Sequence, residues 1–288
     1  EFVPVEIPAP APTEQETVEE PVVYEPNIMD FDFEALAQSA GNSNVAALHN
    51  YVSTVQPTMK NEYTGLFAGK NLILITAEAF TSQVIDQERT PTLYRMATQG
   101  IQFRDYYQPA WGASTTTGEF SNLVGLVPTT AGMCMKEATQ QDLFLTMGHQ
   151  LQAQNYYSAA YHNHNKDFYD RDKTHTHLGY DRFLARYGGL EGITGVFPES
   201  DLEMIDVTVP QYIDHQPFSI YYMTVSGHCG YSLKENAQAR KNYDLVKDMD
   251  HVEAVKCYLA SQLELEKAMT SLIKQLEDAG IADDTVIV

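Results

Sequence analysis

The stretch NLILITAEAF, residues 71–80, sets a short apolar run, residues 71–76, between Lys70 and Glu78. A continuous apolar run of this length with polar residues on either side predicts a strand that is buried on both faces. Such strands occur mainly in parallel sheets that helices cover on both sides. This stretch therefore indicates the class of fold, and the rest of the chain extends the same pattern.

Helical and strand patterns alternate on the C-terminal side of this strand. Pro91 near the start and Gly100 at the end of residues 90–100 are typical of a helix, and a longer helix at about 249–279 ends before Gly280. We also expect helices at about 141–154 and near 200–213, and strands at 101–107, 156–162, 218–226 and 285–288. This alternation predicts an α/β fold in one domain, a mainly parallel sheet with helices on both faces.

The N-terminal residues differ in composition from the rest. No Lys or Arg precedes Lys60, and residues 1–26 concentrate Glu and Pro. Such a segment buries too little apolar surface to offset the entropy lost on ordering, so we expect a mobile acidic tether over residues 1 to about 30. A binding arm is the alternative. Residues 32–55 have weak helical character, and we assign residues 1–44 to the tether and lead-in and residues 45–288 to one domain.

The charge balance limits the partners of the protein. The 288 residues hold 18 Lys and Arg against 39 Asp and Glu, a formal net charge of -21. This charge gives no long-range attraction to nucleic acid or to an anionic membrane, so we expect no nucleic-acid partner, and an anionic substrate must be captured locally. No apolar run reaches the roughly 18 to 20 residues that cross a bilayer, which predicts a soluble chain.

Three cysteines, Cys134, Cys229 and Cys257, lie far apart without metal-ligand spacing. They neither require nor exclude an oxidising compartment. Cys257 lies on an apolar helical face, and we expect it to be a small buried hydrophobic residue.

Small hydroxyl residues cluster in WGASTTTGEF, residues 111–120. Ser and Thr are common at helix starts, where they accept backbone N–H bonds, and residues 118–126 suit a helix. The same position also favours a nucleophile that reacts with a phosphate, because the helix dipole stabilises negative charge there. The cluster alone leaves both interpretations open.

Several polar groups lie at the ends of predicted strands. Glu78 follows the first strand, the threonines follow strand 101–107, His162 ends strand 156–162, and His228 follows strand 218–226. In open α/β sheets ligands bind at the carboxyl ends of the strands, so we expect these groups to meet at one edge. Each also has a structural alternative, since a loop carboxylate can be solvated and a histidine can simply be hydrogen-bonded within the fold.

Four motifs, in this order, resemble a known family. NLILITAEAF, TTTGEF, YHNHNKDFYDRDKTHTHLGYDRF and MTVSGHCGY are similar to the extracellular catalytic domain of lipoteichoic acid synthases and related phosphoglycerol transferases, in the sulfatase and alkaline-phosphatase superfamily. The similarity covers about residues 45–288 and makes this range the expected catalytic domain. It implies an alkaline-phosphatase/sulfatase-like fold and a divalent-metal enzyme, with manganese expected and magnesium as the alternative.

The resemblance assigns a nucleophile and a metal ligand. Glu78 corresponds to the metal-binding glutamate of the family, and Thr115 to its catalytic threonine, which also binds the metal. The family motif is Thr-Ser-Asp-x-Glu-Phe; this chain has Thr116 and Thr117 in place of Ser-Asp and keeps the Glu-Phe pair at 119–120. Coordination to a divalent cation lowers the pKa of a threonine hydroxyl and orients its oxygen for attack on phosphorus.

The resemblance also assigns substrate-binding residues. The family's His, and its Trp-x-Arg seven residues further on, become His162 and Tyr169-Asp170-Arg171, and His228 resembles the histidine that binds the substrate phosphate. Tyrosine in place of tryptophan keeps an aromatic wall and adds a hydroxyl. We expect Arg171 to bind phosphate oxygens as a fork, and both histidines to donate to them or to protonate a leaving oxygen.

Three more histidines, His164, His175 and His177, lie in the same motif. They suggest a second metal site, but the family gives them no such role and we expect them to be structural.

Glu78 and Thr115 supply two metal ligands, and the family's Asp-His pair follows the strand that ends this sequence. We therefore expect this chain to lack part of the metal site, to bind manganese weakly and to show no transfer by itself.

The function that the resemblance implies is transfer of glycerophosphate from a phosphatidylglycerol-type lipid to a cell-envelope polymer or glycolipid, through a threonine-linked intermediate. The expected location is the extracellular face of a bacterial cell membrane, with membrane association through a part of the parent protein outside this chain. A sulfatase is an alternative, although the chain has no Cys/Ser-x-Pro-x-Arg sequence for a formylglycine. A phosphoethanolamine transferase is a second alternative, although that class of enzymes is richer in cysteine. A third is a noncatalytic relative that binds a surface polyanion or glycolipid.

Overall fold

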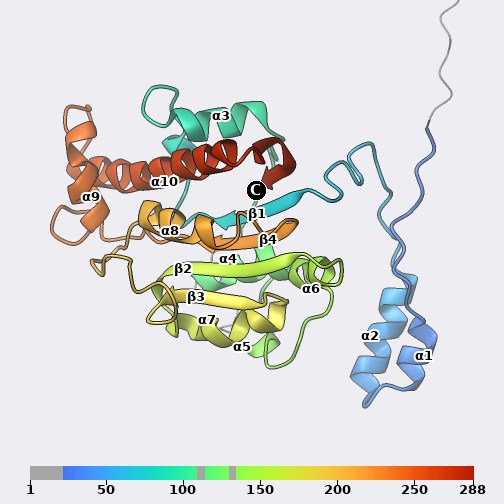
Figure 1. Cartoon of the computed structure of the whole chain (residues 1–288). Helices are drawn as coiled ribbons and strands as arrows, with labels where there is room; N and C mark the ends of the chain where they lie inside the picture. Colours follow the sequence, from blue (N-terminus) through green and yellow to red (C-terminus); the bar gives the residue numbers. More distant parts are fainter. Residues whose placement is uncertain (1–21, 109–113, 130–133) are drawn as a thin grey trace, which may run out of the picture. The chain divides into compact units, whose positions relative to one another are not determined.

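The computed structural model describes residues 22–108, 114–129 and 134–288 (Figure 1). The expected tether falls largely outside these residues, as does the Trp111 end of the threonine stretch. The chain divides into two compact units, Glu1–Ala68 and Gly69–Val288, and each is described by itself. Within the described ranges, no helix has the length and apolar character needed to span a membrane. The domain boundary expected at residue 45 remains a prediction.

The first unit contains two short helices, α1 (Phe33–Gln38) and α2 (Ser43–Thr54). The side chain of Asp32 caps α1 by accepting from the N–H of Ala35, and Asn42 caps α2 in the same way. The helical character expected for residues 32–55 is confirmed. Neither helix buries a residue, so caps and mutual packing are what hold this pair.

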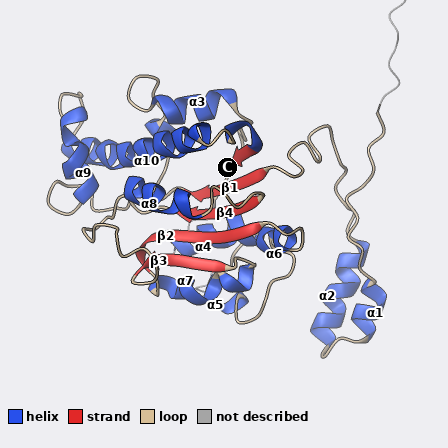
Figure 2. Ribbon diagram, viewed as in Figure 1, coloured by secondary structure: helices blue, strands red, loops and turns tan. Residues whose placement is uncertain are grey.

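The second unit is built on a five-stranded sheet in which every strand pairing is parallel, with the order β3-β2-β4-β1-β5 (Figure 2). The strands are β1 (Asn71–Thr76), β2 (Tyr157–Asn165), β3 (Arg182–Arg186), β4 (Phe218–Met223) and β5 (Thr285–Ile287). The expected α/β class is therefore confirmed.

Helices cover both faces of this sheet (Figure 1). They are α3 (Pro91–Gln99), α4 (Ser114–Val124), α5 (Cys134–Ala138), α6 (Met147–Gln152), α7 (Arg171–Thr174), α8 (Asp201–Thr208), α9 (Ala237–Asn242) and α10 (Glu253–Asp278). Short 3₁₀ turns lie at η1 (Ser82–Val84), η2 (Phe168–Asp170), η3 (Thr176–Leu178), η4 (Val209–Gln211), η5 (Tyr243–Leu245) and η6 (Ala282–Asp284). Helices α3, α8 and α10 lie on one face, and α4, α5 and α7 on the other.

The alternation of side chains along the central strands divides the core in two. Ile73 of β1 packs in the cluster that includes Leu272 of α10, while the next residue, Leu74, packs with Phe120 of α4 on the opposite face. Burial on both faces is the reason that β1 reads as one unbroken apolar run. Cys257 is fully buried on α10, as expected.

Two expected elements differ from the structure. Residues 101–107 form no strand and pair with none of the strands, and their apolar side chains, such as Phe103 and Tyr107, are exposed. The threonine helix thus follows a loop. The helix expected at 141–154 shortens to α6, because the hydroxyl of Thr146 donates to the carbonyl of Leu143 and competes with a helical turn.

One strand was not expected. β3 has the sequence RFLAR, in which an arginine stands at each end of three apolar residues. A run this short carries no period that distinguishes it from a loop. It becomes a strand because β2 offers it a parallel partner.

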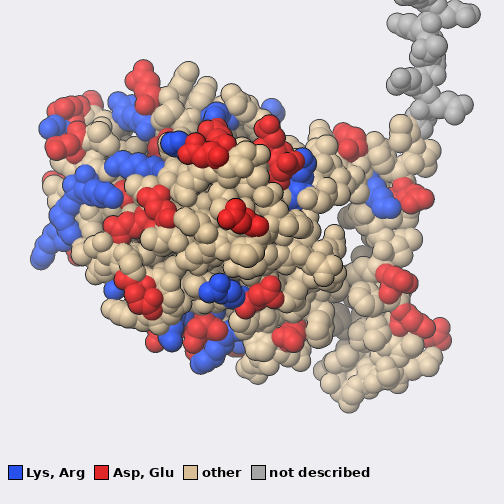
Figure 3. All heavy atoms as spheres, viewed as in Figure 1, with Lys and Arg blue, Asp and Glu red and all other residues tan. Residues whose placement is uncertain are grey.

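The surface agrees with the need for local capture of anions. On the face shown in Figure 3, acidic side chains are spread widely, and Lys and Arg lie in several places between them, including near α9, whose last turn carries Arg240 and Lys241. Any attraction for a phosphate must then come from groups inside a pocket.

Candidate active site

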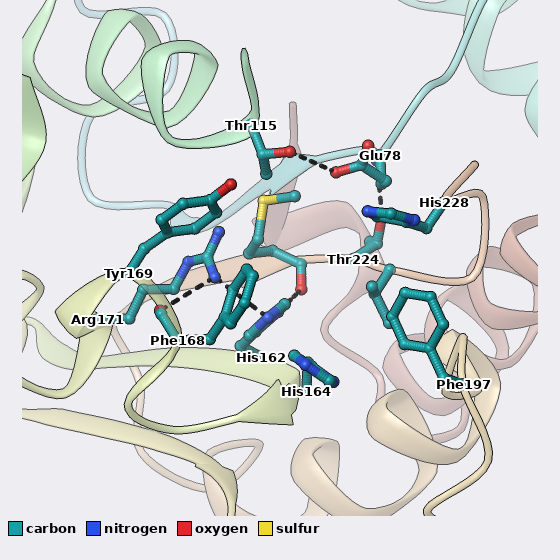
Figure 4. Close-up of a pocket in the computed structure, with 12 residues that line it drawn as sticks. Glu78, Thr115, His162, His164, Phe168, Tyr169, Arg171, Phe197, Thr224 and His228 are labelled. Atoms are coloured by element: carbon teal, nitrogen blue, oxygen red, sulfur yellow. Dashed lines mark hydrogen bonds between the residues drawn. The ribbon is translucent and has the colours of Figure 1, made fainter. Parts of the chain in front are cut away.

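A cavity of about 280 Å³ lies at the carboxyl end of the sheet (Figure 4). It brings together all six residues that the sequence singled out: Glu78, Thr115, His162, Tyr169, Arg171 and His228. They come from the end of β1, the start of α4, the end of β2 with the segment after it, and the loop after β4. The position follows the rule for parallel sheets, in which loops at the carboxyl ends build the site.

Thr115 lies in the first turn of α4, and its hydroxyl donates to a carboxylate oxygen of Glu78 at 3.2 Å. The backbone of Glu78 is held as well, since its N–H donates to the hydroxyl of Thr224 at 2.9 Å and its carbonyl accepts from Gln262 at 3.1 Å. Within the described residues, the other carboxylate oxygen of Glu78 has no hydrogen-bond partner. This oxygen and the Thr115 hydroxyl are thus open to a ligand.

The environment of Glu78 disfavours an isolated charge. Burial raises the pKa of this carboxyl above its ordinary value, and the proximity of His228 and the hydrogen bond from Thr115 offset only part of the rise. A cation placed beside the carboxylate would reverse the effect.

Arg171 and Glu119 form a buried ion pair behind the pocket wall. The guanidinium Nη2 donates to Glu119 Oε2 at 2.7 Å and Nε at 3.0 Å, and both side chains are almost fully buried. Tyr221 also donates a hydrogen bond to this carboxylate, at 3.2 Å. Burial alone would raise the pKa of Glu119, but Arg171 and His175 outweigh it and hold the pKa well below the ordinary range.

This pair changes what Arg171 can do. The Nε–Nη2 edge that would grip phosphate as a fork is already bonded to Glu119. The remaining nitrogen, Nη1, lies 3.3 Å from His162 Nε2 and 3.4 Å from the carbonyl of Phe168. Arg171 therefore presents positive charge to the pocket without a free bidentate edge.

His162 has both ring nitrogens occupied. Nδ1 lies 2.8 Å from the carbonyl of Met223, and because a carbonyl only accepts, Nδ1 carries the proton. Nε2 then accepts from Arg171. Burial first, and then the charge of Arg171, lower the pKa of His162 well below its ordinary value, so the ring is neutral. In this arrangement both ring nitrogens of His162 contact protein groups, and Nε2 lies against Arg171; a role for His162 in protonating a leaving oxygen stays a prediction.

Strained backbone surrounds the pocket. Tyr169 and Asp170 follow one another in the left-handed region, at φ 61° and 55°, and Ala79, next to Glu78, has φ 53°. Residues with a Cβ avoid this region unless their surroundings impose it. The turn places the Tyr169 ring 5.2 Å from the Arg171 guanidinium carbon, which is cation–π distance.

The loop after β4 carries His228 to the pocket. Its start is held by Asp201, which accepts from the N–H groups of Val225 and Ser226 at 2.9 and 3.2 Å. Gly227 comes next, where a Cβ would collide with the carbonyl oxygen of Glu78. This close approach brings the His228 loop against the residues that follow β1.

The other three histidines, His164, His175 and His177, have different surroundings in the structure. His177 is partly exposed and pairs with Asp142 at 2.7 Å, and His175 is buried 3.5 Å from Glu119, so both have structural partners. His164 differs, because it lines the pocket. No group of three or more His, Cys, Asp or Glu side chains placed to hold a metal occurs in residues 22–108, 114–129 and 134–288.

The donor atoms of Glu78 and Thr115 fit part of a site for a hard divalent cation. One carboxylate and one hydroxyl are oxygen ligands of the kind that manganese and magnesium prefer, and both residues line the pocket. Two ligands are fewer than such sites usually contain. The remaining positions would have to be filled by water, substrate or other protein groups.

A parallel sheet covered on both faces, with a hydroxyl at a helix start beside the carboxylate that follows the first strand, defines an alkaline-phosphatase/sulfatase-like protein. The sequence model of the Sulfatase family matches residues 70–288, and the chain belongs to this family.

Similar proteins narrow the comparison. Lipoteichoic acid synthase 1 of Bacillus subtilis is 27% identical over 262 residues, which are 86% of this chain and 40% of that protein. The crystal structure of the lipoteichoic acid synthase LtaP from Listeria monocytogenes has a TM-score of 0.67 at 23% identity, covering 88% of this chain and 60% of the other. The phosphoglycerol transferase GacH from Streptococcus pyogenes, in complex with sn-glycerol-1-phosphate, has a TM-score of 0.54 at 15% identity, covering 86% and 65%. The chain thus spans about 40% of the curated relative's length.

Sequence reasoning missed two residues of the site. Glu119 served only to align the threonine motif, and nothing in its neighbours along the chain signals Arg171 as its partner, 52 residues away. His164 was grouped with structural histidines. Its spacing of two from His162 on a strand gave a signal, since alternate residues of a strand share a face.

Proposed function

We propose that the protein transfers glycerophosphate from a phosphatidylglycerol-type lipid to a cell-envelope polymer or glycolipid, through an intermediate linked to Thr115. The observation that carries this proposal is the Thr115 hydroxyl at a helix start, 3.2 Å from the Glu78 carboxylate and facing a pocket with Arg171 in its wall. The names of the similar proteins, lipoteichoic acid synthases and a phosphoglycerol transferase, support the same substrate class.

The chain's own groups divide the work. The Thr115 oxygen attacks phosphorus, its bond to phosphorus forms, and the bond to the diacylglycerol oxygen breaks. The N-terminus of the eleven-residue helix α4 favours the negative charge of the phosphate. Arg171 adds positive charge from the wall, held in place by Glu119 and His162. In a second displacement the acceptor hydroxyl takes the glycerophosphoryl group and frees Thr115.

A divalent cation completes the proposal, with manganese first and magnesium second, since members of this superfamily are generally divalent-metal dependent. Glu78 and Thr115 would hold it. When bound, such an ion lowers the pKa of the threonine hydroxyl and offsets charge on the phosphate. Glu78 would then act by binding the ion and orienting the Thr115 oxygen.

The proposal includes a place and an extent. The catalytic domain would occupy residues 45–288 at the extracellular face of a bacterial cell membrane. Association with the membrane would come through a part of the parent protein outside this chain. The lipid donor is consistent with that location, because its headgroup lies at the membrane surface.

The test is turnover of labelled phosphatidylglycerol by the full-length protein with and without manganese. We expect release of diacylglycerol, and a peptide containing Thr115 that gains the mass of a glycerophosphoryl group when the acceptor is withheld. Turnover of an aryl sulfate or of phosphatidylethanolamine in place of phosphatidylglycerol would favour a sulfatase or a phosphoethanolamine transferase. Metal-independent binding of a polyanion with no turnover of any ester would favour a noncatalytic binding protein.

A further inference from the structure

Three histidines line the pocket, and they differ in what their nitrogens can still do. His162 has both nitrogens bonded inside the protein, to Met223 and Arg171. His228 lies beside Glu78, where Figure 4 draws it next to the Thr115 end of the pocket. His164 is drawn at the other end, across the pocket from Thr115.

His164 is held by a buried carboxylate. Its Nδ1 lies 3.0 and 3.1 Å from the two oxygens of Glu199, and since carboxylate oxygens accept, Nδ1 carries a proton. Glu199 is itself buried and bonded to Arg186. Burial would raise the pKa of Glu199, but the hydrogen bond and charge of His164 keep it below the ordinary value, so the carboxyl is ionised. The pair has the form of a histidine oriented by an acid.

The second nitrogen of His164 is directed away from Glu199. Within the described residues, Nε2 has no hydrogen-bond partner, and the side chain is 20% exposed. Phe168 and Phe197 contact the ring edge-on, with centroids at 5.3 and 5.5 Å, and limit its rotation. The charged or titratable groups around it are Glu199, Arg186, His162 and, across Phe197, His228. An oriented, accessible Nε2 is what proton transfer requires.

We propose that His164 is the residue that transfers the proton at the oxygen opposite Thr115, with Glu199 as its positioning residue. The inference rests on the proposed function, because it deepens the two displacements at that site. In phosphoryl transfer the attacking and leaving oxygens are roughly in line, so the diacylglycerol oxygen leaves from the side away from Thr115, and the acceptor oxygen later enters there. His164 lies on that side.

Thr115 enters the first displacement as the alkoxide and leaves the second as the alkoxide, so its own proton cancels and the proton balance closes through His164 over the cycle. In the first displacement Nε2–H of the protonated His164 gives its proton to the leaving diacylglycerol oxygen, as the bond from phosphorus to that oxygen breaks. The ring is then neutral, and Nε2 accepts the proton of the acceptor hydroxyl as the acceptor oxygen bonds to phosphorus and the Thr115 oxygen leaves. Glu199 stabilises the imidazolium form at both ends of the cycle.

The experiment compares leaving groups in the full-length protein. His164→Gln is assayed on phosphatidylglycerol, whose alkoxide leaving group needs a proton, and on the p-nitrophenyl ester of glycerophosphate, whose phenolate does not. We expect a loss of about 10² to 10⁴-fold on the lipid and less than about tenfold in nitrophenol release. His177→Gln, at a histidine whose acid partner lies outside the pocket, is the matched control and should leave both rates unchanged.

Equal losses on both substrates, or no loss on the lipid, would overturn the inference, because a structural role does not depend on the leaving group. Glu199→Gln gives a second readout should His164→Gln fold poorly. Removing that charge weakens the hold on His164 Nδ1, so the lipid rate should again fall more than nitrophenol release; equal losses in this variant would also count against the idea. If the wild type cleaves the aryl ester and other alkyl phosphodiesters but not phosphatidylglycerol, the proposed donor is wrong and the leaving-group comparison still decides the role of His164.

Discussion

The two halves of the pocket are built in opposite ways. The anchored half, defined as Glu119, His162 and Arg171, is almost fully buried, and its charges and ring nitrogens are bonded to one another or to the backbone. The open half, defined as Glu78, Thr115 and His228, is only partly buried. Glu78 and Thr115 share a single hydrogen bond of 3.2 Å, which leaves an oxygen of Glu78 free within the described residues.

The difference separates position from reactivity. In the anchored half, hydrogen bonds from Arg171 to Glu119 and His162 hold the guanidinium, so it needs no ligand to stay in place. In the open half, burial raises the pKa of Glu78, and among the residues that the structure describes no Lys or Arg forms a salt bridge with it, so this part of the pocket gains most from a ligand. Ligand-binding residues commonly lower the free energy of unfolding of the protein. Substitutions in the two halves of this pocket can measure that cost residue by residue.

The largest effect should come from the open half. Thr115→Ala removes the proposed nucleophile and should lower transfer by more than about 10³-fold, while Thr116→Ala should lower it less than about tenfold. Thermal unfolding should show that both variants fold. Diacylglycerol release from labelled lipid measures the rates. Equal losses at the two positions would mean that the threonine register is wrong.

Glu119→Gln should give the largest loss of stability. It leaves the buried Arg171 charge uncompensated, which typically costs about 3 to 5 kcal/mol of unfolding free energy. Urea denaturation measures the loss, and adding Arg171→Gln to the same chain should recover part of it. The exposed pair of Lys274 and Asp278 supplies a control, since Asp278→Asn should change stability little. If Glu119→Gln loses no more unfolding free energy than Asp278→Asn, the ion pair of Glu119 and Arg171 does not stabilise the anchored half.

Glu78→Gln should act on stability in the other direction. In the protein treated with a chelator it removes a poorly compensated charge, so the unfolding free energy at pH 7 should rise by about 1 kcal/mol while transfer is lost. If Glu78→Gln is less stable than the wild type under these conditions, the charge of Glu78 is well compensated in the protein, which contradicts our description of the open half.

The two glutamates should also respond to pH with opposite sign. The pKa of Glu119 is lowered on folding, so its stabilisation is present above its ordinary value of 4.5 and is lost as the pH falls further toward the folded pKa. The pKa of Glu78 is raised, so its contribution becomes more favourable as the pH falls through that value. Urea denaturation from pH 7 to pH 3 should therefore show a flatter acid loss in Glu119→Gln and a steeper one in Glu78→Gln. If the free energy of unfolding depends on pH in the same way in both variants and in the wild type, the two glutamates do not differ in the sign of their pKa shifts.

The smallest effect concerns the aromatic wall. Tyr169→Trp, which introduces the aromatic residue of the related family, keeps a ring over Arg171 and should change transfer less than about threefold. Tyr169→Ala loses the cation–π contact, worth about 1 kcal/mol or roughly fivefold in rate. Steady-state kinetics on the lipid substrate distinguish the two. A large loss in Tyr169→Trp would indicate that the tyrosine hydroxyl itself contacts the substrate.

The secondary structure was predictable where one element's own residues carry the pattern. β1, β2, β4, α3 and α10 follow from apolar runs, a helix start with proline and a long amphipathic stripe. Residues 101–107 failed because strand propensity does not supply a partner, and β3 was missed because a partner supplies what its short sequence does not. In both cases the outcome was decided by pairing, which is a tertiary event.

The sequence by itself determined the class of fold, the family, and which side chains approach one another, because strand ends in a parallel sheet share one edge whatever the details of packing. Only the tertiary structure decided what those side chains do once they meet. Arg171 became a partner of Glu119, His162 became neutral with no nitrogen to spare, and His164 gained Glu199 and an open nitrogen. Hydrogen bonds and burial between residues far apart in the chain set charge and proton position, and neither is written in any local pattern of residues.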